Sequence, residues 1–479
     1  MIYARNLRLR PLRQHQKDAT NKFDTAMSAF FALDMRLGKT ITSIRWIKRR
    51  INGRKISVIV APKTTLLSWE EELQKEYIVP VLLEGSSIQK AHTYLSQESG
   101  AWMLVNYEAF LSKEFLRAFD KHPPDALLLD ESTRIKNHKS KTTQALMQIC
   151  DIVPLKVCLS GLPTPQSLED IWSQMAFLNN GRWMGCSNFY RWRKRHTEID
   201  PTSFGEHGRI FPPAQERLII AKYQAEAFCL TRKQAEKQYG LAMPDKVFEK
   251  YHGEMSKEEK FAYKYVVKNM ELPEGPFSNI SKRVRETDPD FEDILGMSHE
   301  ADHAIVQLSW LRRIPTFLPT SWKYTELVDL LRTLGADKGK EKVVVWFAFS
   351  AEIQNAKERL VKEGIACRSM QGTTPTHERR AMIKEFNTSP SMNVILIQKK
   401  LGQFGLNLSV SSTAIYFSNS YSLEQRAQSE DRIFLPGKKN LLIIDLITKG
   451  TTDEEVRSIL SSKRTVSART LARKALDQC

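Results

Sequence analysis

Short, almost uninterrupted apolar runs constrain the fold of this chain more than any other feature. Four of them lie in the first 180 residues: KISVIVAP (55–62), WMLVNYE (102–108), ALLLDES (126–132) and KVCLSG (156–161). Each is rich in β-forming residues and ends in small or polar ones, and stretches of helical period separate them. Such runs are typical of parallel strands that are buried on both faces. The first part of the chain is therefore predicted to be an α/β domain.

The same pattern returns near the C-terminal end, in EKVVVWFAFS (341–350), MNVILIQ (392–398), STAIYFSN (412–419) and NLLIIDLI (440–447). The region between the two sets is rich in Trp, Arg, Lys and Glu and favours helices and loops. We therefore predict a first α/β lobe at 1–180, mainly helical insertions and a linker at 181–335, a second α/β lobe at 336–460 and a basic tail at 461–479.

The tripeptide Gly38-Lys39-Thr40 resembles the end of a phosphate-binding loop, G-x-x-x-x-G-K-[ST]. It follows an apolar run and precedes a helical pattern, which is the context that such a loop requires. Backbone N–H groups of Leu37 and Gly38, with the helix dipole, would hold phosphate oxygens. Lys39 would reach the β- and γ-phosphates, and the Thr40 hydroxyl would ligate Mg²⁺. Leu33 stands where the first glycine belongs, so an ordinary helix start is the alternative.

Two adjacent carboxylates, Asp130 and Glu131, end the run at 126–132. The carboxyl ends of parallel strands meet at one edge of a sheet, so this pair is expected near the GKT loop. Asp130 would hold Mg²⁺ through water, and Glu131 would orient or deprotonate an attacking water. The alternative is a surface acidic pair with no chemical role.

A third candidate, Arg432, lies in SLEQRAQSEDRIF (422–434) after a strand of the second predicted sheet. It could reach the site of the first lobe as an arginine finger. Alternatively, it pairs with Asp431 or Glu430 on a solvated helix.

The charge and cysteine content narrow the class of protein. A formal net charge of +17 indicates a polyanionic partner, most simply nucleic acid. The six cysteines form no C-x-x-C pair and have no histidine cluster beside them, which predicts reduced thiols rather than zinc or disulfide sites.

No apolar run approaches the roughly 18 residues of a membrane span, and the N-terminal residues lack a secretory apolar core. We expect a cytoplasmic protein.

These motifs resemble those of superfamily-two helicases, and in detail those of Swi/Snf translocases on double-stranded DNA. They occur in the family's order along nearly the whole chain. The most family-specific piece is the RIKN segment within DESTRIKNHKS (130–140), which resembles motif II. The other matching segments are LRQHQKDA (12–19, Q motif), VIVAPKTTLLSWEEE (58–72, motif Ia), LSGLPTPQSLEDIWSQMAFL (159–178, motif III), QGTTPTHERRAMIKEFN (371–387), IQKKLGQFGLNLS (397–409) and QSEDRIFLPGKK (428–439). Compact versions of this kind are familiar from bacteriophages and bacteria.

The resemblance implies two tandem RecA-like domains, with ATP and Mg²⁺ in the cleft between them and duplex DNA across both. It implies that Gln16 reads adenine, that Ser160 and Gly161 couple hydrolysis to movement, and that Gly405 approaches the nucleotide or the DNA backbone closely. Gln428 and Arg432 would sense the γ-phosphate. The implied DNA contacts are Pro62, Lys63, Thr64, Asn106, Tyr107, Ser350, Gly372, Lys399 and Lys400.

The chain departs from the family pattern at three places. Ser132-Thr133 replace the usual Ala-His after Asp-Glu, and Leu162 replaces a threonine of motif III. Leu435 replaces the second arginine of the last motif. Leucine cannot stabilise transition-state charge. Either Arg432 suffices, or hydrolysis is slow, or a nearby base substitutes, for which the candidates are Arg426, Lys438 and Lys439.

Four functions fit this pattern. The first is an ATP-driven translocase on double-stranded or branched DNA, with fork remodelling or branch migration as its work. We expect such a protein to be monomeric and cytoplasmic, in a bacterial host if it is phage-encoded. The second is a strand-separating DNA or RNA helicase. The third is an ATP-gated DNA-binding protein that hydrolyses poorly, and the fourth is the motor subunit of a nuclease complex. The RIKN segment and the ungapped motif III favour the first.

Overall fold

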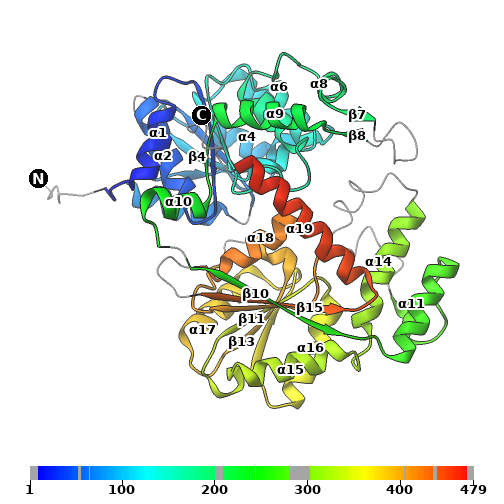
Figure 1. The fold of residues 1–479 in the computed structure, drawn as a ribbon. Helices are drawn as coiled ribbons and strands as arrows, with labels where there is room; N and C mark the ends of the chain where they lie inside the picture. Colours follow the sequence, from blue (N-terminus) through cyan, green and yellow to red (C-terminus); the bar gives the residue numbers. More distant parts are fainter. Residues whose placement is uncertain are drawn as a thin grey trace, which may run out of the picture. The chain divides into compact units, whose positions relative to one another are not determined.

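The computed structural model describes residues 9–51, 55–63, 65–199, 209–242, 244–280, 302–403, 406–434 and 440–471. The chain forms two compact units, the first made of residues 1–241 with 465–479 and the second of residues 242–464 (Figure 1). None of the helices among the described residues is both long enough and apolar enough to cross a membrane.

The first unit is built on a seven-stranded sheet, in the order β3-β4-β2-β5-β6-β1-β9. All of its strand pairs are parallel. The strands are β1 (Ser28–Leu33), β2 (Ser57–Ala61), β3 (Val81–Leu82), β4 (Trp102–Asn106), β5 (Ala126–Leu129), β6 (Leu155–Leu159) and β9 (Ala227–Leu230). The four predicted runs are β2, β4, β5 and β6, and every residue in them is buried.

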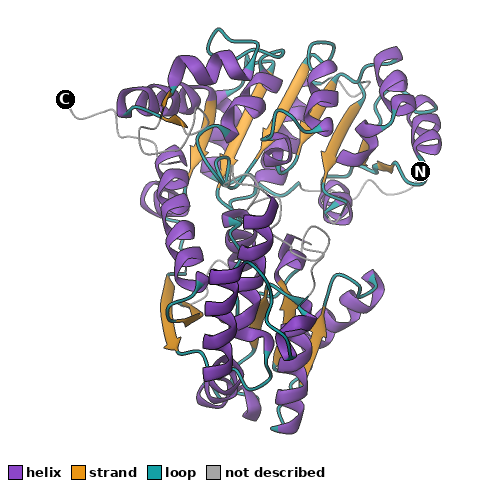
Figure 2. Ribbon diagram, turned by 90° about the vertical axis from the view of Figure 1, so that its right-hand side faces the viewer, coloured by secondary structure: helices purple, strands orange, loops and turns teal. Residues whose placement is uncertain are grey.

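Helices lie on both faces of this sheet, as Figure 2 shows for each unit. They are α1 (Gln14–Lys22), α2 (Lys39–Arg50), α3 (Leu66–Lys75), α4 (Ser87–Leu95), α5 (Lys113–Lys121), α6 (Lys141–Gln148), α7 (Asp170–Leu178), α8 (Phe189–His196), α9 (Pro213–Glu226) and α10 (Arg232–Tyr239). Two short 3₁₀ helices, η1 (Tyr107–Leu111) and η2 (Ser132–Ile135), follow β4 and β5, and β7 (Glu198–Ile199) pairs with β8 (Arg209–Ile210).

Polar residues before the helices explain several of the helix starts. Ser86, Ser140 and Thr231 each accept a hydrogen bond from the backbone N–H three residues later, which satisfies one donor that the first helical turn leaves free. At the other end of α10, Gly240 adopts a left-handed φ of 63° that stops the helix.

The second unit contains a six-stranded sheet, in the order β10-β15-β14-β11-β13-β12, and all of its strand pairs are parallel. Its strands are β10 (Lys246–Gly253), β11 (Val343–Phe347), β12 (Cys367–Met370), β13 (Val394–Gln398), β14 (Thr413–Tyr416) and β15 (Leu441–Thr448). Its helices are α11 (Lys257–Asn269), η3 (Pro276–Asn279), α14 (Asp302–Phe317), α15 (Trp322–Thr333), η4 (Ala336–Lys338), α16 (Ser350–Lys362), α17 (Thr376–Thr388), η5 (Lys399–Gln403), α18 (Leu423–Arg432) and α19 (Thr452–Leu471). Residues 465–471 of α19 belong to the first unit.

Two parallel sheets in tandem, each between helices, make the predicted pair of RecA-like domains, and the α/β fold class is confirmed. The unit boundary falls at 241/242, inside the region 181–335 that was predicted to be mainly helical. Two strands of that region complete the sheets: β9 pairs with β1, and β10 pairs with β15 along its whole length. Only four residues form β9, and β10 is a half-exposed edge strand, so neither carries a long apolar run.

Candidate functional site

The loop between β1 and α2 shows why Leu33 can stand where the phosphate-loop pattern has its first glycine. Leu33 is the last residue of β1, is fully buried and pairs with Leu230. Positive φ angles occur further along, at Arg36 (68°) and Gly38 (81°), so the position of Leu33 does not require glycine. Gly38, in contrast, requires glycine for two reasons. Its backbone is left-handed, and a Cβ there would lie 2.2 Å from Nε2 of Gln16.

Asp34 and Arg232 hold this loop against the edge of β9. The Asp34 N–H donates to the Leu230 carbonyl (3.0 Å), and the Arg232 N–H donates to Oδ2 of Asp34 (2.9 Å). The Arg232 guanidinium also donates to the Met35 carbonyl (3.2 Å). The sequence reading missed both residues, since they lie 198 positions apart. The position of Asp34 directly after β1 was the one feature of the sequence that could have indicated its role in holding the loop.

Helix α1 supports the loop from the other side. Gln16 is buried, and its Nε2 donates to the Leu37 carbonyl at 3.3 Å. Nε2 of His15 lies 2.9 Å from the same oxygen, and burial lowers the pKa of this histidine. Oε1 of Gln16 accepts from the Arg13 N–H at 2.9 Å. These bonds fix Gln16 beside the predicted phosphate loop, and its reading of adenine stays a prediction.

Lys39 and Gly161 are neighbours at the end of the sheet. Nζ of Lys39 donates to the Leu33 carbonyl at 3.0 Å. A Cβ on Gly161, which follows β6, would lie 3.0 Å from that Nζ and 3.1 Å from Cγ of Met35. The adjacent Ser160 is buried, and its Oγ accepts from the Leu162 N–H at 3.0 Å. The absence of a side chain at Gly161 therefore leaves room for the lysine.

Asp130 lies in the same neighbourhood. Its Oδ2 accepts from Nε1 of Trp69 (2.7 Å) and its Oδ1 from the Glu131 N–H (3.0 Å). Burial raises the pKa of Asp130, while the Trp69 hydrogen bond and the charge of Lys39 act to lower it. The structure thus brings Lys39, Gly161 and Asp130 to one edge of the sheet. Trp69 was not predicted, because nothing in motif Ia marks it as a partner of Asp130.

The chain turns sharply after Asp130. Glu131 has a φ of 50°, a left-handed value that is uncommon for a non-glycine residue and is often found at functional sites. Ser132 is buried and donates to Oε1 of Gln174 (2.7 Å), and Nε2 of Gln174 donates to the Pro163 carbonyl (2.9 Å). Ser132 therefore connects the acidic turn to α7 and to the segment after β6.

In the second unit, α18 carries the predicted γ-phosphate sensors. Nε of Arg432 donates to the Gly402 carbonyl at 2.7 Å. Gln428 is buried and donates to Glu424 at 3.2 Å, and its Oε1 has no hydrogen-bond partner among the described residues. Gly405 and Leu435 lie outside the described residues, as do Lys438 and Lys439.

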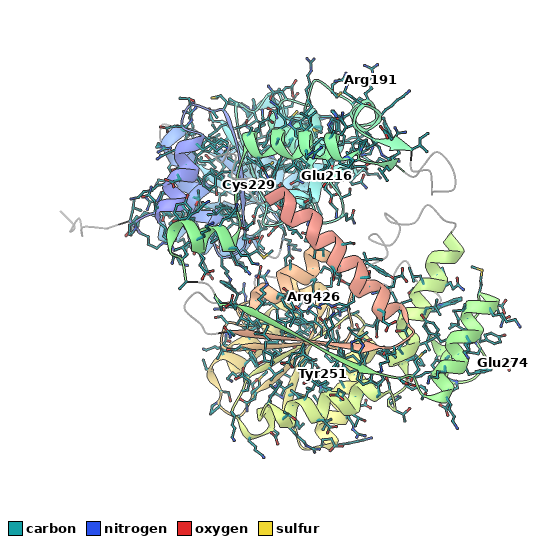
Figure 3. All side chains as sticks on the ribbon, viewed as in Figure 1. Arg191, Glu216, Cys229, Tyr251, Glu274 and Arg426 are labelled. Atoms are coloured by element: carbon teal, nitrogen blue, oxygen red, sulfur yellow. The ribbon has the colours of Figure 1, made fainter. Side chains whose placement is uncertain are left out.

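Arg426 cannot replace the missing second arginine, and this corrects one expectation from the sequence. Its side chain is fully buried inside the second unit, where Figure 3 labels it. The guanidinium pairs with Asp445 and Glu430, and it lies 3.5 Å from the ring centroid of Tyr416. Burial alone would lower the pKa of Arg426, but the two carboxylates raise it above its ordinary value. The arginine is committed to this internal network.

Two predicted DNA contacts of the first unit, Asn106 and Tyr107, have buried side chains, and their contact with DNA stays a prediction. Asn106 is buried, and its Oδ1 accepts from Nζ of Lys90 at 2.7 Å. Tyr107 is buried, and its hydroxyl donates to the Asp130 carbonyl at 2.7 Å. Because η1 begins at Tyr107, the turn directs both side chains inward. Pro62 is also buried, Lys63 is exposed, and Thr64 lies outside the described residues.

In the second unit, Lys399 is also buried, and its contact with DNA stays a prediction. Its Nζ lies 3.2 Å from Oδ1 of Asn419 and 5.2 Å from the Tyr416 ring centroid. It therefore contributes to the network around Arg426. The next lysine, Lys400, is exposed.

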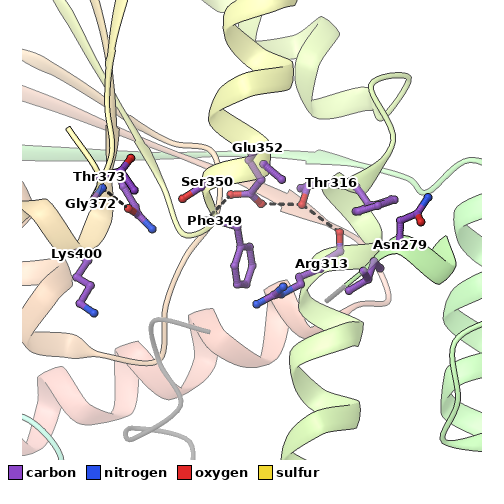
Figure 4. A pocket seen from close by; sticks show the side chains of 13 residues that line it. Asn279, Arg313, Thr316, Phe349, Ser350, Glu352, Gly372, Thr373 and Lys400 are labelled. Atoms are coloured by element: carbon purple, nitrogen blue, oxygen red, sulfur yellow. Dashed lines mark hydrogen bonds between the residues drawn. The ribbon is translucent and has the colours of Figure 1, made fainter. Parts of the chain in front are cut away.

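Lys400 lines a cavity of about 510 Å³ together with two other predicted contacts, Ser350 and Gly372 (Figure 4). Ser350 is the first residue of α16, and the Gly372 N–H donates to Oε1 of Gln398 (2.9 Å). The opposite wall includes Asn279 and Arg313, and the Arg313 guanidinium lies 4.7 Å from the Phe349 ring centroid. Sequence reasoning missed this wall because the region 181–335 has too little pattern.

Two family models match the chain. The SNF2-related domain matches residues 15–302, and the helicase conserved C-terminal domain matches residues 322–434. The chain belongs to the SNF2 family. The SNF2-related match covers the GKT loop, the acidic turn and Gly161, and the helicase match covers α18.

Curated relatives of this SNF2 chain include a probable ATP-dependent DNA helicase, CHR23, of Arabidopsis thaliana. It is 24% identical over 94% of this chain and 42% of its own length. A putative ATP-dependent helicase/translocase, YwqA, of Bacillus subtilis is 23% identical over 95% of this chain and 48% of its own. The chain thus spans less than half the length of either. A solved Sulfolobus solfataricus SWI2/SNF2 ATPase core in complex with dsDNA is 20% identical, with a TM-score of 0.42, over 96% of this chain and 94% of that one.

Proposed function

We propose that this SNF2 chain is an ATP-driven translocase on double-stranded DNA, with fork remodelling or branch migration as its work. The observation that carries the proposal is the convergence of Lys39, Gly161 and Asp130 at one edge of the first sheet. Two relatives are named as an ATP-dependent DNA helicase and an ATP-dependent helicase/translocase, which supports this class of activity.

Lys39 has the contacts that a phosphate-binding lysine needs. Its Nζ donates to a neutral carbonyl, that of Leu33, and it can exchange this bond for a stronger one to phosphate oxygens. The first N–H groups of α2 point toward the same region, where the positive end of the helix dipole favours phosphate. Gln16 and Asp34 hold the loop in place for this binding.

Thr40 and Asp130 are the residues that would hold Mg²⁺. Among the described residues, no group of three or more His, Cys, Asp or Glu side chains could form a metal site. Both oxygens of Asp130 already accept hydrogen bonds, which fits contact with the ion through water. Mg²⁺ commonly retains waters and binds substrate phosphates, whose developing charge it neutralises. The left-handed turn at Glu131 would set the carboxylate that orients the attacking water.

The cavity beside α16 is the candidate phosphate contact for DNA in the second unit. Lys400 supplies a positive charge there, and Ser350 supplies a hydroxyl at the helix N-terminus. Contacts of this type position the duplex and carry little sequence information. The net charge of +17 favours the same partner and predicts that affinity falls steeply with salt.

Triplex displacement separates translocation from strand separation. If the chain moves along duplex DNA without opening it, it should displace a third strand from a triplex when ATP is present. It should then leave a forked duplex of the same sequence paired. Displacement and unwinding are followed by release of a labelled strand, with Lys39→Ala as the inactive control. Unwinding of the fork at the same rate would instead indicate a strand-separating helicase.

Gly161 gives a second test that depends on its contact with Lys39. The Cβ of Gly161→Ala would lie 3.0 Å from Nζ of Lys39 and displace it by a few tenths of an ångström. A displacement of 1 Å can cost about 100-fold in rate. We expect kcat for ATP hydrolysis to fall about tenfold in Gly161→Ala and about 100-fold in Gly161→Val. Thermal unfolding should change little in the alanine variant, and an unchanged kcat in both variants would contradict this role.

A slow, ATP-gated DNA-binding protein is the second candidate. It is favoured by Leu435 together with the burial of Arg426, which removes one possible substitute arginine. Efficient hydrolysis in the presence of DNA would reject it.

A further inference from the structure

A second cavity, of about 260 Å³, lies in the first unit among α6, α7 and α8. The function proposed above uses none of its lining residues. Its main lining side chains are His138, Met147, Trp172, Asn188, Phe189 and Tyr190. The cavity thus joins the segment after the acidic turn to the basic, aromatic stretch WMGCSNFYRWRKRH (183–196), whose buried residues belong to the core of the first unit.

The walls of this cavity are uncharged and combine four aromatic rings with polar side chains and one methionine. The rings are those of His138, Trp172, Phe189 and Tyr190, and the polar residues are Thr143, Gln144, Ser187 and Asn188. The rings of His138 and Phe189 stack with centroids 3.9 Å apart, and Tyr190 meets His138 edge-on at 5.1 Å. Burial, with Lys139 and Arg193 nearby, lowers the pKa of His138 to about 4, so its imidazole is neutral at pH 7. Tyr190 is 53% exposed, which leaves its ring accessible to a planar ligand.

Two polar atoms beside the cavity lack partners among the described residues. Nε1 of Trp172 and Nε2 of His138 are enclosed and make no hydrogen bond there. The Trp172 side chain is only 5% exposed, so solvent does not compensate its indole N–H. Buried donors without acceptors are costly, but both atoms are enclosed, so they are not contact points for a ligand in the cavity.

Most of the residues that line the cavity belong to two basic segments, whose exposed Lys and Arg side chains are here called the basic rim. Residues 134–147 contain four Lys or Arg and residues 182–197 contain five, and neither segment contains an Asp or Glu. Lys139 extends over the Tyr190 ring at 5.8 Å, while Arg191, Lys194 and Arg195 are exposed on α8. Figure 3 shows Arg191 at the outer surface of the unit. This charge selects a polyanion rather than an apolar or basic peptide.

We propose that this cavity takes one unpaired nucleobase of a single-stranded nucleic acid, and that the basic rim holds the neighbouring phosphates. Aromatic platforms beside basic grooves are how proteins bind single strands without sequence preference. The volume is below the roughly 300 Å³ at which pockets for drug-sized ligands begin, which suits one base better than a whole nucleotide. The site goes beyond translocation on a duplex, since it would hold a strand that a fork or branch leaves unpaired.

The test compares a labelled dT12 strand with an abasic strand of the same length by fluorescence anisotropy, without nucleotide. The abasic strand keeps the phosphates but removes the stacking. The wild type should bind dT12 about tenfold more tightly, because each stacked base contributes on that scale. Tyr190→Ala should abolish the preference, and Tyr190→Phe should keep it. Tyr77→Ala is the matched control, since Tyr77 is 50% exposed on the same unit, and it should keep the preference.

Each outcome decides the proposal. Loss of the preference in Tyr190→Ala alone supports it. Two results overturn the proposal: equal binding of dT12 and the abasic strand by the wild type, or a preference for dT12 that survives in Tyr190→Ala. Equal binding by the wild type would favour an aromatic side chain of a protein partner as the occupant of the cavity. Lys39→Ala should keep the preference even though it stops ATP hydrolysis. The base site and the proposed motor can therefore fail independently.

Discussion

Lys39→Ala should lower kcat for DNA-stimulated ATP hydrolysis by about 10²–10³-fold, the usual cost of losing one preorganised donor for transition-state charge. The structure gives the reason: Nζ of Lys39 is held on the Leu33 carbonyl, beside Gly161 and close to Asp130. Alanine leaves the phosphates without this positive charge. Turnover is measured by phosphate release at saturating duplex DNA.

The matched control for this change is Lys48→Ala on the same helix. Lys48 is exposed, and its Nζ donates to the Glu76 carbonyl at 3.2 Å. Its removal should change kcat less than twofold, since surface substitutions of this kind have small effects. Similar losses in both variants would mean that α2 has been disturbed as a whole. Full activity in Lys39→Ala would contradict the assignment of the phosphate loop.

The second large effect is expected from Arg426→Ala, which should lower the free energy of unfolding of the second unit by about 3–5 kcal/mol. The change leaves Asp445 and Glu430 buried without their main partner, and it removes the cation from the face of Tyr416. Removing one member of a buried ion network is costly because the other charges stay in a low-dielectric interior. Urea unfolding followed by circular dichroism measures the change.

Arg359→Ala is the comparison for this stability change. Arg359 lies on α16 of the same unit and pairs with Glu363 at the surface, where its side chain is 43% exposed. Surface pairs of this kind contribute about 0–1 kcal/mol. A double variant, Arg426→Met with Asp445→Asn, should recover part of the stability because it removes one of the two carboxylate charges that lose their partner. A loss in Arg426→Ala no larger than in Arg359→Ala would disprove the structural role of the network.

Buried strands were predictable from the sequence, whereas edge strands were not. The eight apolar runs became central strands because a strand covered on both faces must be apolar along its length. The outer strand β10 has charged and apolar residues side by side, so its sequence, KVFEKYHG, resembles a loop or a helix. Its place beside β15 depends on tertiary pairing that no local window contains.

Some residues of the candidate site were likewise predictable from the sequence, and others were not. Lys39 and Asp130 were predictable because the chemistry of each depends on residues directly beside it in the sequence. The bond from Arg232 to Asp34 was not, because it joins positions 198 apart. The burial of Asn106, Tyr107 and Lys399 was not predictable either, because it depends on the short 3₁₀ helices that follow β4 and β13. A polar residue after a strand predicts a site, but it does not predict the direction of the side chain.

Two questions about the motor motifs have structural answers. Leu33 needs no glycine, since it ends a buried strand and the loop turns at Arg36 and Gly38 instead. Arg426 is excluded as the second arginine by its burial. The role of the second arginine, which Leu435 replaces, therefore falls to Arg432 or to Lys438 and Lys439. Nε of Arg432 donates to the Gly402 carbonyl.

We propose that this chain couples ATP hydrolysis to contact with duplex DNA. The rate of ATP hydrolysis by the wild type, measured with and without double-stranded DNA at low and high salt, tests this coupling most directly. We expect turnover to rise at least tenfold with duplex DNA and to lose that stimulation as salt increases, since phosphate contacts carry the binding. Hydrolysis that stays at the level of Lys39→Ala, with DNA present and at low salt, would contradict it.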